Sequence, residues 1–107
     1  MSPVAVITGG GTGIGAATAQ RFAQDGLDVV VCGRRREPLE ATAEAIRTAY
    51  PMVTARAVVM DVTDAASVAA AAVEIGPCDV LVNNAGGAIG SERVEDGKPD
   101  ELSLIHI

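Results

Sequence analysis

The sequence predicts an α/β protein built on a doubly wound parallel sheet. Short, continuous apolar runs recur along its 107 residues, and amphipathic segments separate them. Continuous apolar runs are typical of strands that are buried on both faces of a parallel sheet. Strands that alternate with helices imply right-handed crossovers, which place helices on the two faces of the sheet.

Four apolar runs are the expected strands. They are short and rich in valine, and they span residues 4–7, 29–32, 57–60 and 80–82. Because neither alternation nor charge interrupts them, we expect each strand to be covered on both sides.

Three segments between these runs show helical spacing of apolar residues. We expect the buried faces to comprise Ile14, Ala17 and Phe22 in the first helix, Leu39, Ala43, Ile46 and Tyr50 in the second, and Val68, Ala71 or Ala72, and Ile75 in the third. Gly26 and Gly76 suit the left-handed residue that follows a helix, and Pro51 ends the second helix. Asp64 is the expected N-cap of the third.

Composition restricts the classes of partner. The net charge of -6 argues against general binding to nucleic acid or to an anionic membrane, because phosphate neutralisation requires clustered positive charge. No apolar run approaches about 18 residues, and no signal peptide is evident, so we expect a cytoplasmic protein. Cys32, Cys78 and the single histidine, His106, do not have the spacing of a metal site. The two cysteines are expected to be small buried hydrophobes.

A glycine-rich loop follows the first apolar run. Helix N-termini bind anions through their free N–H groups, and the sequence from Thr8 to Gly15 leads from a strand into such a helix. Gly9 permits the turn, Gly13 allows close approach of a pyrophosphate, and Gly15 allows tight packing of helix on strand. A structural turn without a ligand is the alternative. The loop residues expected to bind a dinucleotide are Gly9, Gly11, Thr12, Gly13, Ile14 and Gly15.

Cofactor choice is expected at the end of the second strand, about 20 residues beyond the glycines, where an acid would bind the ribose hydroxyls of NAD. Gly33 occupies this position, and Arg34, Arg35 and Arg36 follow it. Guanidinium groups are suited to a 2′-phosphate. Arg34 and Arg35 therefore favour NADP, and NAD is the less favoured cofactor.

Solvated surface charge is the alternative interpretation of these arginines. Glu37 and Glu40 follow closely and offer ion-pair partners. Runs of charge usually lie on the surface, so only their position at the strand end favours a ligand.

A second motif, Asn83-Asn84-Ala85-Gly86, closes the run at residues 80–82. Together with the glycine loop, it resembles the short-chain dehydrogenase/reductase family; an ordinary Asn-Gly turn is the alternative. The resemblance implies a Rossmann-like sheet with the strand order 3-2-1-4-5-6-7. It also implies that Asn83 ties the fourth strand to its neighbours. The implied contacts are the nicotinamide ribose for Asn84, Ala85 and Gly86, and adenine for Asp61 and Val62.

Asp61 also has a structural interpretation, as a strand-end acid that begins the cap of the third helix, and both roles are compatible. Within the family, the residues from Gly33 to Arg35 and the run 83–90 look most like reductases of small hydroxy acids or related carbonyl compounds, such as NADP-dependent 3-hydroxy acid dehydrogenases. This subfamily resemblance is weak, and it identifies no substrate.

The family's catalytic elements are a Ser and a Tyr-x-x-x-Lys downstream of the second motif. The only tyrosine, Tyr50, lies upstream and precedes Pro51, so we expect no catalytic residue in this chain. We expect residues 1–101 to be a partial NAD(P)-binding domain, truncated after the fourth strand. Residues 102–107 equal a translation of the mosaic-end adapter of transposase-based sequencing libraries, and a native apolar tail is the alternative.

The resemblance implies an oxidoreductase that transfers hydride between NADP(H) and a small carbonyl or alcohol substrate. It also implies a homo-oligomer. The 107-residue chain itself is expected to be inactive. A non-catalytic dinucleotide-binding or regulatory module is the other class of function that the sequence leaves open.

Overall fold

The computed structural model describes residues 3–11 and 13–84, and four parallel strands form its sheet. The order β3-β2-β1-β4 and the parallel pairing confirm the expected fold class. In register, Val6 of β1 lies between Val30 of β2 and Leu81 of β4. The expected adapter-derived residues, 102–107, lie outside the described residues and their origin stays a prediction. The strands are β1 (Val4–Thr8), β2 (Asp28–Gly33), β3 (Ala55–Val59) and β4 (Val80–Asn83).

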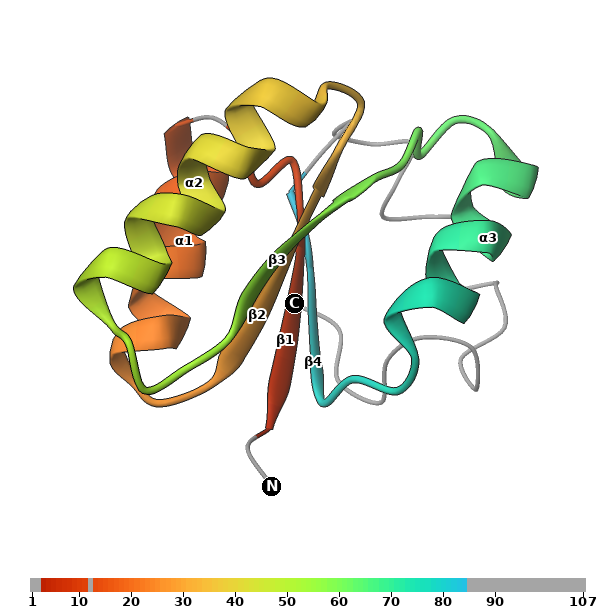
Figure 1. Cartoon of the computed structure of the whole chain (residues 1–107). Coiled ribbons are helices and arrows are strands. Elements are labelled where there is room, and N and C mark those ends of the chain that lie inside the picture. Colours follow the sequence, from red (N-terminus) through yellow and green to blue (C-terminus); the bar gives the residue numbers. More distant parts are fainter. Residues whose placement is uncertain (1–2, 12, 85–107) are drawn as a thin grey trace.

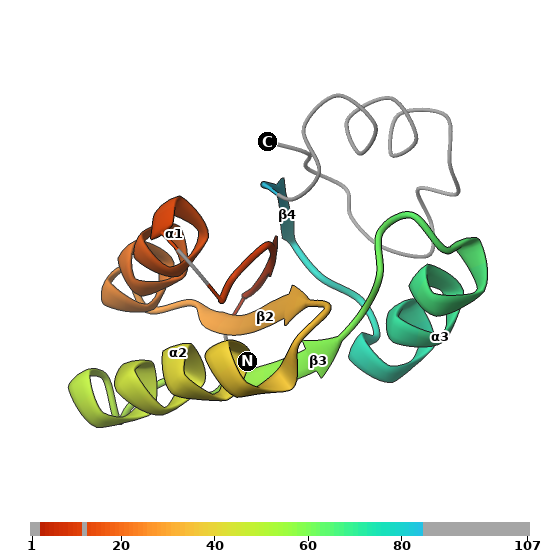
Figure 2. The same ribbon diagram turned by 90° about the horizontal axis from the view of Figure 1, so that it is seen from above.

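In the described part of the chain, three helices cover the sheet, two on one face and one on the other (Figure 1). The first two run side by side across one face, and the third lies on the opposite face, as the view from above also shows (Figure 2). Helices on both faces make the sheet doubly wound, as the sequence predicts. They are α1 (Gly13–Gln24), α2 (Arg36–Ala49) and α3 (Ala65–Ile75).

Side chains of the central strands alternate between two separate cores. Ile7 and Val31 pack in the core beneath α1 and α2, whereas Val6 and Val30 pack in the core beneath α3. All four are buried, with exposed fractions of 2% or less. The valine-rich runs are therefore continuous because each residue has a core to enter, whichever face it points to.

The buried face of α1 differs from the predicted one. Its buried residues are Gly15, Ala19 and Ala23, while the side chain of Ile14 is 75% exposed. The helix starts directly after the glycine loop and lies so close to the sheet that only small residues fit beneath it. The expected face was wrong at Ile14 and Ala17, which are exposed, because it ranked hydrophobicity above size. Phe22 is partly buried and packs against the core, as expected.

The expected burial on α2 and α3 is confirmed at Leu39, Ala43 and Ile46, and at Ala71, Ala72 and Ile75. Gly26 and Gly76 have φ angles of 91° and 80°, in the left-handed region that favours glycine. Asp64 caps α3, since its side chain accepts hydrogen bonds from the backbone of Ala66 and Ser67. These local stop and start signals are therefore correct.

β3 begins two residues earlier than the sequence predicts. Its pairing with β2 runs from Val29 and Ala55 to Gly33 and Val59. Arg56 interrupted the apolar pattern, yet an edge strand tolerates a charged side chain. The Arg56 guanidinium reaches the carbonyl of Ile75 at the end of α3, at 3.2 Å, so it supports the strand.

Both cysteines are free and buried, as expected. Burial raises the pKa of the Cys32 thiol to about 12, and it also raises the pKa of Cys78.

No helix in the described part of the chain is long and apolar enough to cross a membrane. Among the same residues, no group of three histidine, cysteine or acidic side chains is arranged to hold a metal ion.

Candidate cofactor site

The glycine loop turns at the carboxyl end of β1 and opens directly into α1. Gly9 and Gly13 have φ angles of 68° and 47°, which few residues other than glycine adopt. The N–H of Gly10 donates to the carbonyl of Cys32, at 3.1 Å, and this bond ties the loop to β2. The first N–H groups of α1 have no partner within a helix, so its N-terminus at this edge is suited to an anion.

Gly15 is the point at which loop, helix and β4 meet. A Cβ atom here would collide with the carbonyl group of Gly9 and would lie 2.9 Å from Nδ2 of Asn84. No side chain larger than hydrogen fits, which confirms the packing role that the sequence predicts for Gly15. The same contacts place Asn84 against the start of α1.

A threonine at the end of β1 joins the two motifs. The hydroxyl of Thr8 accepts a hydrogen bond from the N–H of Asn84, at 2.9 Å. It also lies 3.2 Å from Oδ1 of Asn83 and 3.3 Å from the carbonyl oxygen of Val82, either of which can accept its proton. The expected role of Asn83 in tying β4 to its neighbours is thereby confirmed.

A cavity of about 590 Å³ lies at the carboxyl end of the sheet. Six expected site residues come together on its wall: Gly9, Gly11, Arg34, Arg35, Asp61 and Val62. Five further residues complete the lining: Gly33, Pro38, Leu39, Met60 and Thr63. Three strand ends and the start of α2 therefore build one site from segments that are far apart in the sequence.

The other expected residues lie beside the cavity or outside the described chain. Gly13, Ile14, Gly15 and Asn84 are not on its wall, but Gly15 contacts both the wall residue Gly9 and Asn84. Thr12, Ala85 and Gly86 fall outside the described residues, so their roles stay predictions.

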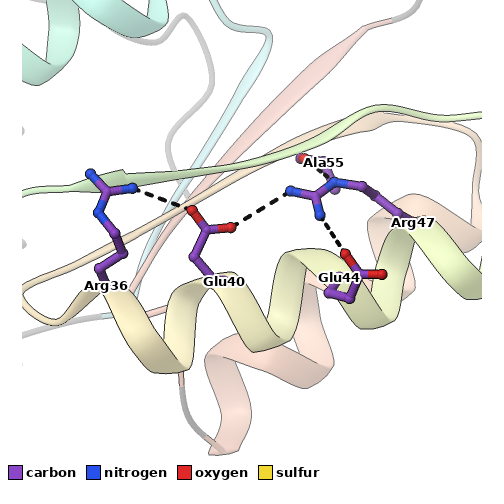
Figure 3. A network of polar contacts seen from close by, with 5 residues as sticks. All are labelled: Arg36, Glu40, Glu44, Arg47 and Ala55. Carbon is purple, nitrogen blue, oxygen red and sulfur yellow. Dashed lines mark hydrogen bonds and ion pairs between the residues drawn. The ribbon is translucent and has the colours of Figure 1, made fainter.

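The three consecutive arginines separate into two kinds. Nη1 of Arg36 lies 3.3 Å from Oε2 of Glu40, and Arg47 continues this network along α2 to Glu40 and Glu44 (Figure 3). The surface-charge interpretation is therefore correct for Arg36, with Glu40 as the partner.

Arg34 and Arg35 line the cavity instead. Within residues 3–11 and 13–84, neither forms an ion pair with an acidic side chain. The wall thus carries two cationic groups whose charge is not compensated by an ion pair in the described chain. Such an arrangement is suited to an anionic ligand that guanidinium groups can bind through paired N–H donors.

The start of α2 forms a wall that the sequence analysis missed. A Cβ atom on Gly11 would lie 3.1 Å from Cβ of Pro38, so the glycine loop and α2 approach closely. Leu39 is buried next to Gly33. Proline in a first helical turn was a local signal of this helix start. Its contact with the glycine loop depends on the fold and had no local signal.

Asp61 and Val62 line the cavity, and each has one polar atom without a partner in the described chain. Oδ1 of Asp61 accepts hydrogen bonds from the N–H and hydroxyl of Thr63, and the N–H of Asp61 donates to Ser67. Within the described chain, Oδ2 of Asp61 and the N–H of Val62 have no hydrogen-bond partner. The Thr63 hydroxyl, then its N–H, lower the pKa of Asp61, so the carboxylate stays ionised.

This acceptor and donor pair complements adenine. The exocyclic amine of adenine donates hydrogen bonds, and the adjacent ring nitrogen accepts one. Asp61 also caps its own turn through Thr63. The structural and ligand-binding interpretations of Asp61 are therefore compatible in geometry, because each uses a different oxygen.

Comparison with known proteins identifies the family. The family model described as short chain dehydrogenase matches residues 3–105. The short-chain reductase protein NovJ of Streptomyces niveus is 49% identical over 87 residues, which are 78% of this chain and 32% of that protein. Serine 3-dehydrogenase of Agrobacterium fabrum is 42% identical over 95 residues, 85% of this chain and 36% of that protein.

A solved structure of L-sorbose reductase from Gluconobacter frateurii, in complex with NADPH and L-sorbose, matches the fold with a TM-score of 0.75. It is 36% identical, and the match covers 79% of this chain and 34% of that one. The chain thus spans about a third of the length of these relatives. Because the family model covers nearly all of it, the chain belongs to the short-chain dehydrogenase family of oxidoreductases.

Proposed function

We propose that the carboxyl end of the sheet binds NADP(H) in an oxidoreductase that acts on a small carbonyl or alcohol substrate. The observation that carries this proposal is the pair Arg34 and Arg35, which line the cavity without an ion-pair partner in the described residues. NADPH differs from NADH by one phosphate group on the adenosine ribose. Two guanidinium groups that have no ion-pair partner in residues 3–11 and 13–84, beside an adenine-complementary edge, fit that difference.

The chain's own residues would hold the cofactor at four points. Arg34 and Arg35 would bind the 2′-phosphate, and Asp61 with Val62 would bind adenine. The glycine loop and the start of α1 would bind the pyrophosphate through backbone N–H groups. Asn84, with Ala85 and Gly86, would lie beside the nicotinamide ribose.

Bound NADPH would supply the hydride, while the protein would supply binding and orientation. A reductase, a serine dehydrogenase and a sorbose reductase are among the relatives, so a carbonyl or hydroxyl carbon is the common chemistry. We propose no finer substrate than this class. The weak resemblance to hydroxy acid enzymes stays a prediction, as do a cytoplasmic location and a homo-oligomeric state.

The competing proposal of a non-catalytic dinucleotide-binding module receives less support, because the family consists of oxidoreductases. Tyr50 does not supply the missing chemistry. It ends α2 and packs partly buried against the core beneath α1 and α2, and it is not on the cavity wall. A Tyr-x-x-x-Lys element in the intact gene would favour the enzyme over the module.

The proposal is tested by replacing Arg34 and Arg35 with alanine in the intact gene product and measuring Kd for NADPH and NADH. Each lost charge-assisted bond is worth about 1.5–3 kcal/mol. We expect NADPH binding to weaken by at least tenfold, with little change for NADH. Gly33→Asp should shift preference the same way, because its carboxylate would repel the 2′-phosphate and bind the ribose hydroxyls of NAD. The new Cβ would lie 3.2 Å from the flexible end of Leu39, which must move by a few tenths of an ångström.

Arg36→Ala is the matched control. This arginine neighbours the other two, but its partner is Glu40 on the surface of α2. We expect an unchanged ratio of the two Kd values, together with at most about 1 kcal/mol of lost stability. An unchanged ratio in the double variant, or an equal loss in the control, would overturn the assignment of the 2′-phosphate.

A further inference from the structure

Thr63 holds the carboxylate of Asp61 with two hydrogen bonds to the same oxygen. Its N–H lies 2.9 Å and its hydroxyl oxygen 2.7 Å from Oδ1 of Asp61. One hydrogen bond would let the carboxylate rotate. Two donors to the same oxygen restrict the direction in which the second oxygen points. Oδ1 is thereby occupied, and Oδ2 keeps its full capacity as an acceptor.

Bonds around Asp61 fix the neighbouring backbone as well. The N–H of Asp61 donates to the hydroxyl of Ser67 on α3, at 2.9 Å, and its carbonyl accepts from the N–H of Asp64, at 3.0 Å. Both bonds anchor this turn to the start of α3. The N–H of Val62 is the donor that this turn leaves without a partner in the described chain.

The hydroxyl of Thr63 is not needed to start α3. Asp64 caps that helix through Ala66 and Ser67. Thr63 is exposed and lies on the cavity wall, and within the described residues its hydroxyl bonds only to Asp61. Its bond is therefore better explained by the orientation of a cavity carboxylate than by the stability of the helix.

We propose that Thr63 is a positioning residue for cofactor specificity: by holding Oδ1 of Asp61, its hydroxyl aims Oδ2 at the exocyclic amine of adenine. This inference rests on the proposed function, because it presumes adenine beside Asp61 and Val62. Thr63 need not touch the cofactor. It sets how sharply the site distinguishes adenine from a base that lacks the amine.

The test compares two cofactors by isothermal titration calorimetry with the intact gene product. One is NADP+, and the other is its purine analogue, in which a hydrogen atom replaces the exocyclic amine and the adjacent ring nitrogen stays an acceptor. An ionised Asp61 should accept from the amine, and the analogue offers it no donor. We expect the wild type to prefer NADP+ by roughly tenfold or more, the value of a hydrogen bond to a charged group.

Three variants isolate the hydroxyl. Thr63→Val keeps the shape and the backbone N–H but removes the hydroxyl donor. We expect the ratio of the two Kd values to fall to about threefold or less, because a lost hydrogen bond to a charged group changes an equilibrium by at least that factor. Thr63→Ser keeps the donor and should keep the wild-type ratio. Thr48→Val is the matched control, an exposed threonine in the last turn of α2 with no hydrogen bond from its side chain in the described chain.

Each outcome decides one question. If the wild type shows no preference, or Asp61→Asn leaves the preference unchanged, adenine is not beside Asp61 and the proposed placement of the cofactor fails. If the wild type prefers NADP+ and Thr63→Val keeps that preference, the positioning role fails while the proposed function stands. If Thr63→Val weakens the binding of both cofactors equally, the role of Thr63 is structural only. Should Thr63→Val not fold, Thr63→Ala serves as the second variant with the same expected ratio.

Discussion

At the amino end of the sheet, carboxylates accept hydrogen bonds from backbone N–H groups. At the carboxyl end, a carboxylate has one oxygen without a hydrogen-bond partner in the described chain. Oδ2 of Asp79 accepts from the N–H of Val4, and Oδ1 of Asp28 accepts from the N–H of Thr54, each at 2.8 Å. These bonds hold the first residues of the strands together. Asp61, on the cavity wall, uses one oxygen in the same structural way, and its other oxygen has no hydrogen-bond partner in the described chain.

The arginines show the same contrast. Arg47 and Arg56 donate to the backbone carbonyls of Ala55 and Ile75 and so complete local structure. Arg34 and Arg35 have no such partner in the described residues, and they line the cavity at the other end. Unused hydrogen-bonding capacity in a concave site is what a ligand needs, and its concentration at the carboxyl end separates the polar groups that we propose to bind cofactor from the structural ones.

The largest effect is expected from a methyl group at the carboxyl end. In Gly15→Ala, the new Cβ would collide with the carbonyl of Gly9 and crowd Asn84, which distorts the loop. We expect a loss of about 1–3 kcal/mol in the free energy of unfolding and no measurable NADP+ binding. Thermal unfolding and calorimetric titration measure the two effects.

Gly26→Ala is the counterpart at the opposite end of α1. Its φ of 91° makes alanine strained, but no atom lies within 4 Å of the added Cβ. Stability should fall by roughly 1–2 kcal/mol with an unchanged Kd for NADP+. Equal effects of the two variants on binding would show that cofactor affinity follows global stability, and the contrast between the ends would be lost.

Replacing two aspartates should also separate stability from binding, with smaller effects than those of the glycine variants. Asp79→Ala removes the acceptor for Val4 and should cost about 0.5–1.5 kcal/mol in the free energy of unfolding, without changing Kd. Asp61→Ala should weaken NADP+ binding by roughly tenfold. If Asp79→Ala weakens binding more than Asp61→Ala does, the two carboxylates have been assigned to the wrong roles.

Cys32 gives the smallest effect at neutral pH, where its thiol is protonated in both states, and it tests whether a buried group at the carboxyl end is purely structural. Its pKa is raised from 9.0 to about 12 by burial, so between these values the unfolded chain loses the proton while the folded chain keeps it. The stabilisation from the protonated thiol is complete below pH 9.0 and is lost as the pH rises toward about 12.

Urea unfolding at several pH values measures this slope, with Cys32→Ala as the control that should flatten it. NADP+ affinity should be the same in this variant, because Cys32 points into the core beneath α3. A steeper slope in the variant would contradict the assignment.

Local signals in the sequence predicted what depends on local chemistry. The left-handed glycines, the Asp64 cap and the spacing of Leu39 and Ile46 all marked features that the structure contains. The fully buried residues of α1 were missed, because a close approach of helix and strand selects for size, which a hydrophobic pattern does not record.

The site was predictable in part for the same reason. The glycine loop and Asp61 carry motif signals, but the division between Arg36 and its two neighbours depends on where α2 begins. Pro38 reaches the cavity only because the fold brings α2 against Gly11. Thr63 was visible as a nearby polar residue. Its two hydrogen bonds to Asp61, however, depend on the turn that precedes α3.

We propose that the carboxyl end of the sheet binds NADP(H) and that the amino end does not. Backbone amide chemical shifts, followed by heteronuclear NMR while NADP+ is added, test it most directly. We expect saturable shifts at Gly10, Arg35 and Val62, weaker ones with NAD+ at equal concentration, and none at Thr54 or Asp79. Saturable shifts confined to the amino end, or the same affinity for NAD+ and NADP+, would contradict it.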